Sequence, residues 1–428
     1  MKPQYNLIKE SWIPCLMSKG KILYLGLLET LQRAHEIKTL SVESPLIEAG
    51  IYRLLLAVLH STFGPESHAV WNEIWQAGKF NDGQLYSYFE SWLDRFYLFH
   101  PDFPFYQYDE PEVGYKTAGN LIQEISSGNN ATLFDHHTDG DVIALKLEEA
   151  ARYLIATQTF SLGGGRSGLK GHYFSDSPWA RGAIFFLKGE NLFQTLMHNL
   201  LLYPDSNVFP TSQEDRPSWE MENPIEPYRR TPYGYLDYLT WFARRIYLKP
   251  EQTADGLVVK EIKLTQGMKL KDDLLDPFKN YLKRGNQRKI LRLSFQEDRA
   301  VWRDSMTLLQ LNQDGRRPPA PFQWAAELAG YGYLDFHQTK RYLAIGMGAN
   351  QAKVSFYRSE LLPLPLRYLK KKELVDDLAV AIKLAEDVRG KLWGALRTLA
   401  RFTLAQGADR EEGHDPGRES MDKLMANW

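Results

Sequence analysis

The stretch "KKELVDDLAVAIKLAEDVRGKLWGALRTLARFTLA" (residues 371–405) divides this chain into two parts of different character. Apolar residues recur in it every three or four positions, which is the period of one face of an α-helix. Pro363 and Pro365 precede it, and proline is a frequent marker of the boundary of a helical segment. We therefore predict a fold of the α+β class, with a large mixed body over residues 1–362 and a helical bundle over residues 363–428.

The body itself mixes the patterns of helices and strands. Short strands with turns are expected over residues 2–30, and residues 44–60 have continuous helical periodicity with a proline near the start. Helical periodicity returns in residues 80–100 and 147–158, whereas "GAIFFLKG" (182–189) is typical of a strand. This alternation within one long segment indicates a single mixed body.

The composition excludes several classes of protein. Of 428 residues, 43% are hydrophobic and 25% are charged, as in an ordinary soluble globular protein. The net charge is −1, so any surface that attracts nucleic acid must be local. The single cysteine, Cys15, excludes an internal disulfide and a multi-cysteine zinc site. Because the N-terminus lacks the apolar core of a signal peptide and no stretch has the length of a membrane span, we expect a cytoplasmic protein.

The segment "FSLGGGRSGLKG" (residues 160–171) holds five glycines, with Arg166 and Lys170 between them. Its glycines match G-x-G-x-x-G, but that fingerprint must follow a strand and open a helix, and here a helical pattern precedes it. The P-loop pattern fails as well, because Leu169 stands where the lysine should be. Two interpretations remain, a flexible surface loop and a bare backbone that another molecule approaches closely.

The segment "FDHHTDGD" (residues 134–141) is the best candidate for a catalytic site. It gathers five side chains of the types that bind metals, and a metal-dependent phosphohydrolase could use Asp135, His136 and Asp139. No second set of ligands stands out elsewhere in the sequence. The phosphohydrolase is therefore the alternative function, and a solvated loop is the simpler interpretation.

Basic residues gather in "PFKNYLKRGNQRKILRL" (residues 277–293), which carries no carboxylate. Just upstream, "TQGMKLKDD" (265–273) adds Lys269 and Lys271. On a chain of net charge −1, such a local excess is typical of a surface that contacts phosphates, and the other interpretation is a solvated face balanced by acids elsewhere. In "GMGANQAKVSFYR" (346–358), Asn350 and Gln351 stand before a strand-like run, where amides either contact base edges or close a turn.

These segments, in this order, resemble one family: the large subunit of the type I-E CRISPR complex Cascade, the CasA family. The resemblance extends over about residues 4–405. Besides the glycine segment, it is carried by "YNLIKESWIP" (5–14), "LSVESPLIEAGIYRLLLAVLH" (40–60), "FYLFHPDFPFYQ" (96–107), "RPSWE" (216–220), "GYLDYLTWFARRI" (234–246), "EDRAVWRD" (297–304) and "GANQAKVSFYRSELLPLPLRYL" (348–369).

The resemblance implies a subunit without a catalytic centre, cofactor or metal, which acts in antiviral defence. Such a subunit recognises the protospacer-adjacent motif in double-stranded DNA through the minor groove and starts duplex opening. Its implied partners are the 5′ handle of the guide RNA, the target DNA, the other Cascade subunits and a helicase-nuclease. A scaffold that holds these partners without touching DNA is a further interpretation.

Residue by residue, the resemblance assigns three DNA-binding segments and one RNA-binding segment. They are the glycine loop (Leu162, Gly163, Gly164, Gly165), the wedge (Gln351, Ala352), the lysine finger (Lys269 or Lys271) and the guide-RNA loop (Phe134, His136). A bare backbone suits close approach to the minor groove, and a wedge unstacks bases at a cost of a few kcal/mol. The sequence departs from the family at its C-terminal end, where we expect an incomplete four-helix bundle.

Overall fold

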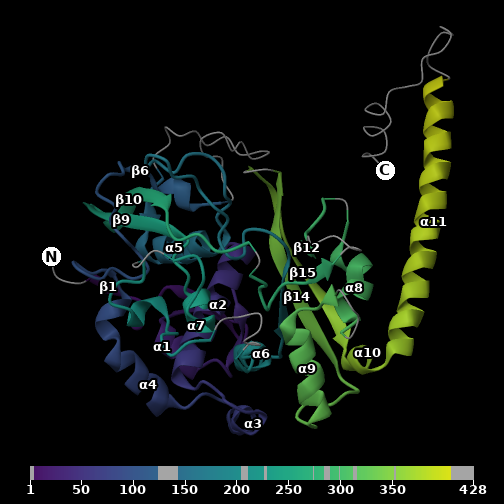
Figure 1. The fold of residues 1–428 in the computed structure, drawn as a ribbon, viewed down its shortest axis with the longest axis horizontal. Coiled ribbons are helices and arrows are strands. Elements are labelled where there is room, and N and C mark those ends of the chain that lie inside the picture. Colours follow the sequence, from purple (N-terminus) through teal and green to yellow (C-terminus); the bar gives the residue numbers. More distant parts are fainter. Residues whose placement is uncertain are drawn as a thin grey trace. The chain divides into compact units, whose positions relative to one another are not determined.

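The computed structural model describes residues 4–123, 143–203, 211–225, 229–272, 274–283, 290–297, 299–311, 316–350 and 353–405. The chain divides into two compact units, Met1–Lys370 and Lys371–Trp428 (Figure 1). Helices and strands both contribute to the first unit, so the predicted α+β class is confirmed. No helix among the described residues is long and apolar enough to cross a membrane.

The described strands form five small antiparallel sheets. Their orders are β1-β5, β3-β2-β4, β6-β10-β7 with β9 also paired to β10, β12-β11-β13, and β15-β14-β8. The strands are β1 (Gln4–Asn6), β2 (Ile13–Met17), β3 (Ile22–Leu25), β4 (Ile37–Leu40), β5 (Tyr97–Phe99), β6 (Lys116–Thr117), β7 (Leu145–Lys146), β8 (Ile184–Lys188), β9 (Arg244–Thr253), β10 (Gly256–Gln266), β11 (Tyr281–Lys283), β12 (Ile290–Arg292), β13 (Arg316–Arg317), β14 (Thr339–Asn350) and β15 (Lys353–Pro365).

Helices pack between and around these sheets. They are α1 (Leu27–Gln32), α2 (Pro45–Thr62), α3 (His68–Ala77), α4 (Asp82–Ser91), α5 (Leu147–Phe160), α6 (Leu192–Asn199), α7 (Tyr235–Leu239), α8 (Ser305–Leu309), α9 (Ala320–Gly330), α10 (Leu366–Lys370) and α11 (Lys372–Ala405). Short 3₁₀ turns cover Leu93–Phe96, Ala118–Leu121, Ser218–Glu220 and Val301–Asp304.

Helix α2 is the centre of the first unit (Figure 1). The Ser44 hydroxyl accepts a hydrogen bond from the Leu46 amide, and Pro45 occupies the first turn, where a missing N–H is tolerated. Every residue from Leu46 to His60 except Glu48 is buried, so the helix is covered on all sides. It packs against α5, α6, α7 and β14, and it brings these elements around one core.

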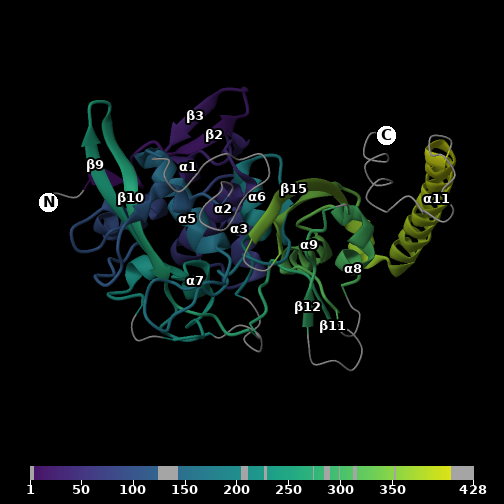
Figure 2. The same ribbon diagram turned by 90° about the horizontal axis from the view of Figure 1, so that it is seen from above.

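Two hairpins extend from this core. Strands β9 and β10 form a long ribbon that projects from the first unit (Figure 2), and a register shift between Val259 and Glu261 interrupts their pairing. Strands β14 and β15 form the other hairpin. Pro363 and Pro365 lie inside β15, which is an edge strand, where proline is tolerated because no ladder hydrogen bond is lost on the open side. The two prolines therefore do not end the body, and the first unit runs on to Lys370.

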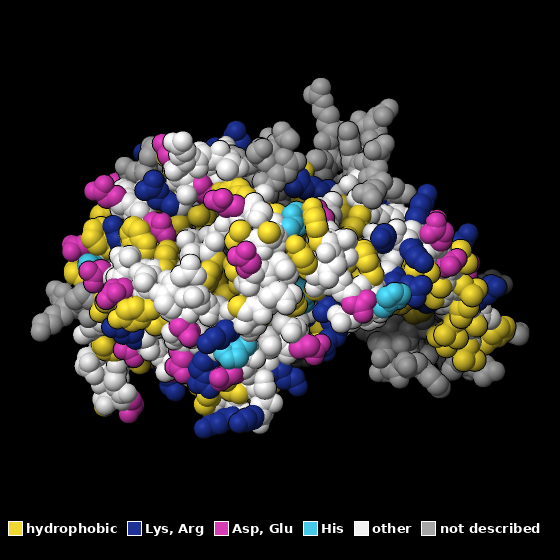
Figure 3. Space-filling model, turned by 90° about the horizontal axis from the view of Figure 1, so that it is seen from below, with side chains coloured by type: hydrophobic (Ala, Val, Ile, Leu, Met, Phe, Trp, Pro, Cys, Tyr) yellow, Lys and Arg dark blue, Asp and Glu magenta, His cyan; other side chains and the backbone are white. Residues whose placement is uncertain are grey.

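The described part of the second unit is the single helix α11. Hydrophobic side chains gather over it, at the right end of Figure 3. Its most exposed large apolar residues are Val380, Leu384, Val388, Leu392, Trp393, Leu399 and Phe402, with exposed fractions of 46–69%. The helix predicted from the periodicity of residues 371–405 is thus confirmed. The remainder of the expected bundle lies outside the described residues.

Candidate nucleic-acid interface

Residues 161–177, here called the glycine hairpin, fold back on themselves directly after α5. The Gly164 amide donates to the Phe174 carbonyl over 2.9 Å, and the Phe174 amide donates to the Gly165 carbonyl over 3.2 Å. These reciprocal bonds are the pattern of an antiparallel pair. The sequence allowed two interpretations of this segment, a flexible loop and a backbone without side chains. The structure shows an irregular hairpin, and one of its arms contains the three consecutive glycines.

The glycines of this arm have different physical roles. A Cβ on Gly163 would lie 2.7 Å from the Asp176 nitrogen, so only glycine allows the two arms to close. The Gly163 amide also donates to the Asp176 carboxylate over 2.7 Å. Gly165 has a φ of +74° and open space beyond its Cα. Because the amides of Gly163 and Gly164 are used within the hairpin, the exposed surface here is backbone without side chains and not a nest of free N–H groups.

A buried arginine holds the first arm. Arg244 opens β9, and its guanidinium donates to the carbonyls of Ser161 over 3.3 Å and Leu162 over 3.0 Å. It also lies 5.0 Å from the ring centroid of Phe174, on the second arm. Burial lowers the pKa of Arg244 to about 9. The guanidinium is therefore a structural group that ties both arms to β9.

A buried glutamine holds the second arm and links it to the lysine segment. Gln266 ends β10, and its amide oxygen accepts from the Ser175 amide over 2.6 Å. Its amide nitrogen donates to the carbonyls of Gly267 and Met268. The Met268 carbonyl also accepts from the Trp241 indole over 3.3 Å. One side chain thus joins the glycine hairpin to the residue before Lys269, so two of the predicted DNA-binding segments share an anchor.

The two candidate lysines differ in exposure. Lys269 is half-buried and follows the anchored Met268, whereas Lys271 is exposed and its backbone amide donates to the Arg230 carbonyl over 3.0 Å. Neither ammonium forms an ion pair with another described residue. Both lysines therefore remain candidates for the lysine finger.

Part of the basic segment 277–293 has a different role from the one predicted. Lys279 is only 3% exposed, and its ammonium donates to the Pro178 carbonyl over 2.6 Å, directly after the glycine hairpin. Burial lowers the pKa of Lys279 to about 8. The interpretation of Lys279 as a phosphate contact is therefore wrong, because a buried side chain that supports a turn cannot reach a ligand. Arg292 is exposed, and Arg284, Arg288 and Lys289 lie outside the described residues.

Four of the assigned residues cannot be placed. Gln351 and Ala352 lie outside the described residues, between β14 and β15, and the two strands pair up to Asn350 and Lys353. Phe134 and His136 of the guide-RNA loop lie outside them as well.

The metal-binding alternative falls on the same segment as the guide-RNA loop, residues 134–141. Asp135, His136 and Asp139 are not among the described residues, and within the part that is described no group of three or more His, Cys, Asp or Glu side chains could hold a metal ion.

Sequence reasoning missed the residues that hold the glycine hairpin in place. Arg244 stands in a dense aromatic and aliphatic segment, and Gln266 ends a strand of ordinary composition. Asp176 closes the hairpin and pairs with Arg181 over 2.7 Å. The sequence contained one signal for the burial of Arg244, namely its position in a run of apolar residues. A charged residue in such a run is usually buried together with a partner.

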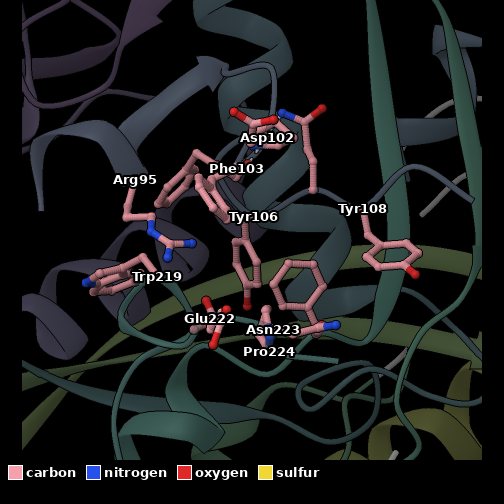
Figure 4. Close-up of a pocket in the computed structure, with 14 residues that line it drawn as sticks. Arg95, Asp102, Phe103, Tyr106, Tyr108, Trp219, Glu222, Asn223 and Pro224 are labelled. Carbon is pink, nitrogen blue, oxygen red and sulfur yellow. Dashed lines mark hydrogen bonds between the residues drawn. The ribbon is translucent and has the colours of Figure 1, made fainter. Parts of the chain in front are cut away.

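An aromatic pocket of about 550 Å³ lies in another part of the first unit. Figure 4 shows Arg95 and Trp219 on one side of Tyr106 and Tyr108 on the other. The Arg95 guanidinium lies 3.8 Å from the ring centroid of Phe103, and the Tyr106 hydroxyl donates to the Trp241 carbonyl over 3.0 Å. Aromatic rings dominate the lining, and its charged groups are Arg95, Asp102 and Glu222.

A family model described as CRISPR-associated protein Cse1 matches residues 6–426. The chain belongs to the Cse1 family. A Cse1 relative from Thermus thermophilus, the CRISPR-associated protein CasA/Cse1, is 34% identical over 446 residues, which cover 98% of this chain and 82% of the relative. The resemblance found in the sequence is thereby confirmed.

Solved structures of the Cse1 family share the fold. The crystal structure of Thermus thermophilus CasA matches with a TM-score of 0.77 and 30% identity, over 99% of this chain and 84% of that one. Thermobifida fusca Cse1 matches with a TM-score of 0.79 and 26% identity over the same shares. A chain of a CRISPR RNA-guided surveillance complex has the same fold, with a TM-score of 0.77 at 21% identity over 93% of this chain and 82% of that one.

Proposed function

We propose that this chain is the large, non-catalytic subunit of a type I-E CRISPR RNA-guided surveillance complex, Cascade, that acts in antiviral defence in the cytoplasm. It recognises the protospacer-adjacent motif in double-stranded DNA and starts duplex opening. It then recruits the helicase-nuclease that degrades the target. Membership of the Cse1 family supports this proposal, and so does the fold shared with a chain of a surveillance complex.

The observation that carries the proposal is the fixed, side-chain-free backbone at Gly164 and Gly165. Arg244 holds one arm of the glycine hairpin and Gln266 holds the other, so this backbone is preorganised before DNA arrives. Backbone without side chains can enter the minor groove, which is about 6 Å wide. The groove presents a degenerate pattern of acceptors, so the recognition would tolerate several motifs.

The shared anchor at Gln266 gives the hairpin a positively charged neighbour. Lys269 or Lys271 would then contact a phosphate while the hairpin lies in the groove. Such a contact fixes the register of the protein on the duplex without adding sequence information.

We assign duplex opening to Gln351 and Ala352, which lie between β14 and β15 in the sequence. A side chain inserted between base pairs unstacks them at a cost of a few kcal/mol, which pairing with the guide RNA then offsets. Phe134 and His136 would contact the 5′ handle of the guide RNA, and the remaining Cascade subunits would complete the assembly.

The test uses the reconstituted complex and two matched DNA substrates, one fully paired and one opened in advance beside the motif. We expect Gln351→Ala to slow guide–target pairing on the paired duplex at least tenfold and to leave the opened substrate unchanged. Gln252→Ala, at an exposed position of β9, is the control and should match the wild type on both.

Two results would contradict the proposal. Equal rates of Gln351→Ala and wild type on the paired duplex would remove the wedge role. Bound metal together with phosphodiester hydrolysis by the isolated chain would favour the phosphohydrolase built on Asp135, His136 and Asp139.

A further inference from the structure

The tip of the glycine hairpin, residues 166–173, carries two cations for which motif recognition has no use. Arg166 and Lys170 are both exposed. The backbones of Arg166 and Tyr173 form an isolated antiparallel β-bridge across the hairpin, so the two residues occupy paired positions. Tyr173 is 56% exposed, which is high for a large aromatic side chain.

The tip is an ordered turn. The Ser167 amide donates to the His172 carbonyl over 3.0 Å, and the Ser167 hydroxyl donates to the same oxygen over 3.2 Å. The His172 amide donates to the Leu169 carbonyl over 3.1 Å. Ser167 is completely buried beneath these bonds. The backbone that carries the two exposed cations is therefore ordered, so less conformational entropy of this backbone is lost when they bind a ligand.

Charge at the tip is not balanced within the hairpin. No carboxylate occurs between Leu162 and Ser175, and Asp176 at the base is paired with Arg181. Arg166 and Lys170 form no ion pair with another residue of the described part. A further cation stands beside the second arm, where the Lys116 ammonium lies 6.0 Å from the ring centroid of Phe174. The tip and its surroundings thus favour an anionic partner.

The order of residues along the arm identifies the anion. Arg166 directly follows Gly165, and the Cα atoms of consecutive residues are about 3.8 Å apart. When the backbone of Gly165 lies in a minor groove about 6 Å wide, the next side chain meets the sugar-phosphate wall of that groove. Lys170 follows in the same exposed tip.

We propose that the tip of the glycine hairpin binds the phosphate backbone of the duplex beyond the flanking motif, through Arg166 and Lys170, with the Tyr173 ring against a sugar. This inference rests on the proposed function, because it places the hairpin in the groove. It adds a second role for the same hairpin. The bare arm discriminates between motifs, and the charged tip supplies affinity that does not depend on sequence.

Salt dependence separates these two roles. Log K falls as log salt rises, and each phosphate contact makes this fall steeper by about 0.9. Loss of two contacts should make it shallower by about 1.8, so the ratio of wild-type to variant affinity should fall roughly twelvefold between 50 and 200 mM salt. The ranking of flanking motifs should stay the same, because phosphate contacts do not distinguish bases.

The experiment compares the wild-type complex with the double variant Arg166→Gln/Lys170→Gln. Dissociation constants are measured at four salt concentrations on matched protospacers with the best and the worst flanking motif. We expect the same fold-loss on both motifs and the smaller slope. The charge-conserving variant Arg166→Lys/Lys170→Arg should keep the wild-type slope, and Lys19→Gln, in the exposed turn between β2 and β3, is the matched control.

Three outcomes would overturn the inference. They are an unchanged slope, a loss confined to the best motif, and a double variant that fails to enter the complex on size-exclusion chromatography. The last outcome would show that the tip contacts a protein subunit. A wild-type complex that binds all flanking motifs alike would instead contradict the proposed function, so the two failures are distinguishable.

Discussion

The glycine hairpin and helix α11 both expose unusual surfaces, but of opposite kinds. The hairpin exposes bare backbone and two cations, and its base is tied to buried polar groups such as Arg244 and Gln266. Helix α11 exposes a stripe of apolar side chains, among them Leu384 and Leu392 at 60–64%. Bare backbone and positive charge suit a polyanion, whereas an apolar stripe suits burial against another protein surface. The difference predicts that the two regions serve different partners, and variants in each should have separable effects.

The largest effect is expected at the buried anchor of the hairpin. Arg244→Met would remove the donor of the Leu162 carbonyl and one of the two donors of the Ser161 carbonyl, which keeps the Ser177 amide at 2.8 Å. A buried acceptor without a partner costs about 1–3 kcal/mol. We expect the free energy of unfolding of the chain to fall by about 1–3 kcal/mol, as measured by urea titration. The complex that does assemble should lose its preference among flanking motifs.

Its neighbour Arg245 is the matched control, because Arg245 pairs with Glu110 and does not contact the hairpin in the described structure. Arg245→Met should retain the ranking of motifs. A retained ranking in Arg244→Met would show that the anchor is not needed for recognition.

A smaller effect, dependent on pH, is expected at the other end of the hairpin. Burial lowers the pKa of Lys279 from its ordinary 10.5 to about 8, so between these values the unfolded chain binds more protons than the folded chain. The free energy of unfolding therefore rises with pH in this window, by up to about 1.4 kcal/mol per pH unit from this group. Urea titrations from about pH 7.5 to 9.5 should show this rise in the wild type. Lys279→Met should show a smaller rise, because it lacks the part that comes from this amine, and equal pH slopes for both proteins would contradict the buried amine.

The smallest effect on stability is expected in α11. Leu384→Gln/Leu392→Gln changes exposed side chains, so the free energy of unfolding of the isolated chain should move by no more than about 0.5 kcal/mol. Retention of the chain in the purified complex should fall at least tenfold, whereas Lys383→Gln/Lys391→Gln on the same helix should not change it. Full retention of the leucine variant would mean that the apolar stripe is not a protein contact.

The sequence predicted the elements that depend on local pattern. Apolar residues repeat with helical period in residues 44–60 and 371–405, and both segments form helices. The glycine segment does contain glycines with positive φ, which other residues rarely adopt. The family resemblance, which the comparisons confirm, also rested on local segments.

Long-range burial was beyond the reach of local pattern. Lys279 stands among other basic residues in the sequence, and nothing in its neighbours distinguishes an exposed lysine from one buried against the Pro178 carbonyl. Arg244 and Gln266 act through backbone atoms of residues 82 and 91 positions away, which no local period encodes. Pro363 and Pro365 are boundary signals in most contexts, but an edge strand accepts them.

The central claim is that the bare arm of the glycine hairpin discriminates between flanking motifs, and Gly165 tests it most directly. Its φ of +74° suits asparagine, and open space lies beyond its Cα, so a short side chain there should leave the fold intact. Gly20 has a φ of +82° and equally open space in a turn distant in sequence, which makes it a matched control.

The measurement is the dissociation constant of the reconstituted complex for a matched protospacer with every flanking trinucleotide. It is made for the wild type, Gly165→Asn, Gly165→Asp and Gly20→Asn. We predict a few preferred motifs for the wild type and for Gly20→Asn, at least tenfold weaker binding of those motifs by Gly165→Asn, and a flat profile for Gly165→Asp. A ranking in Gly165→Asp that equals the wild type, or a wild type that binds all motifs alike, would contradict the account.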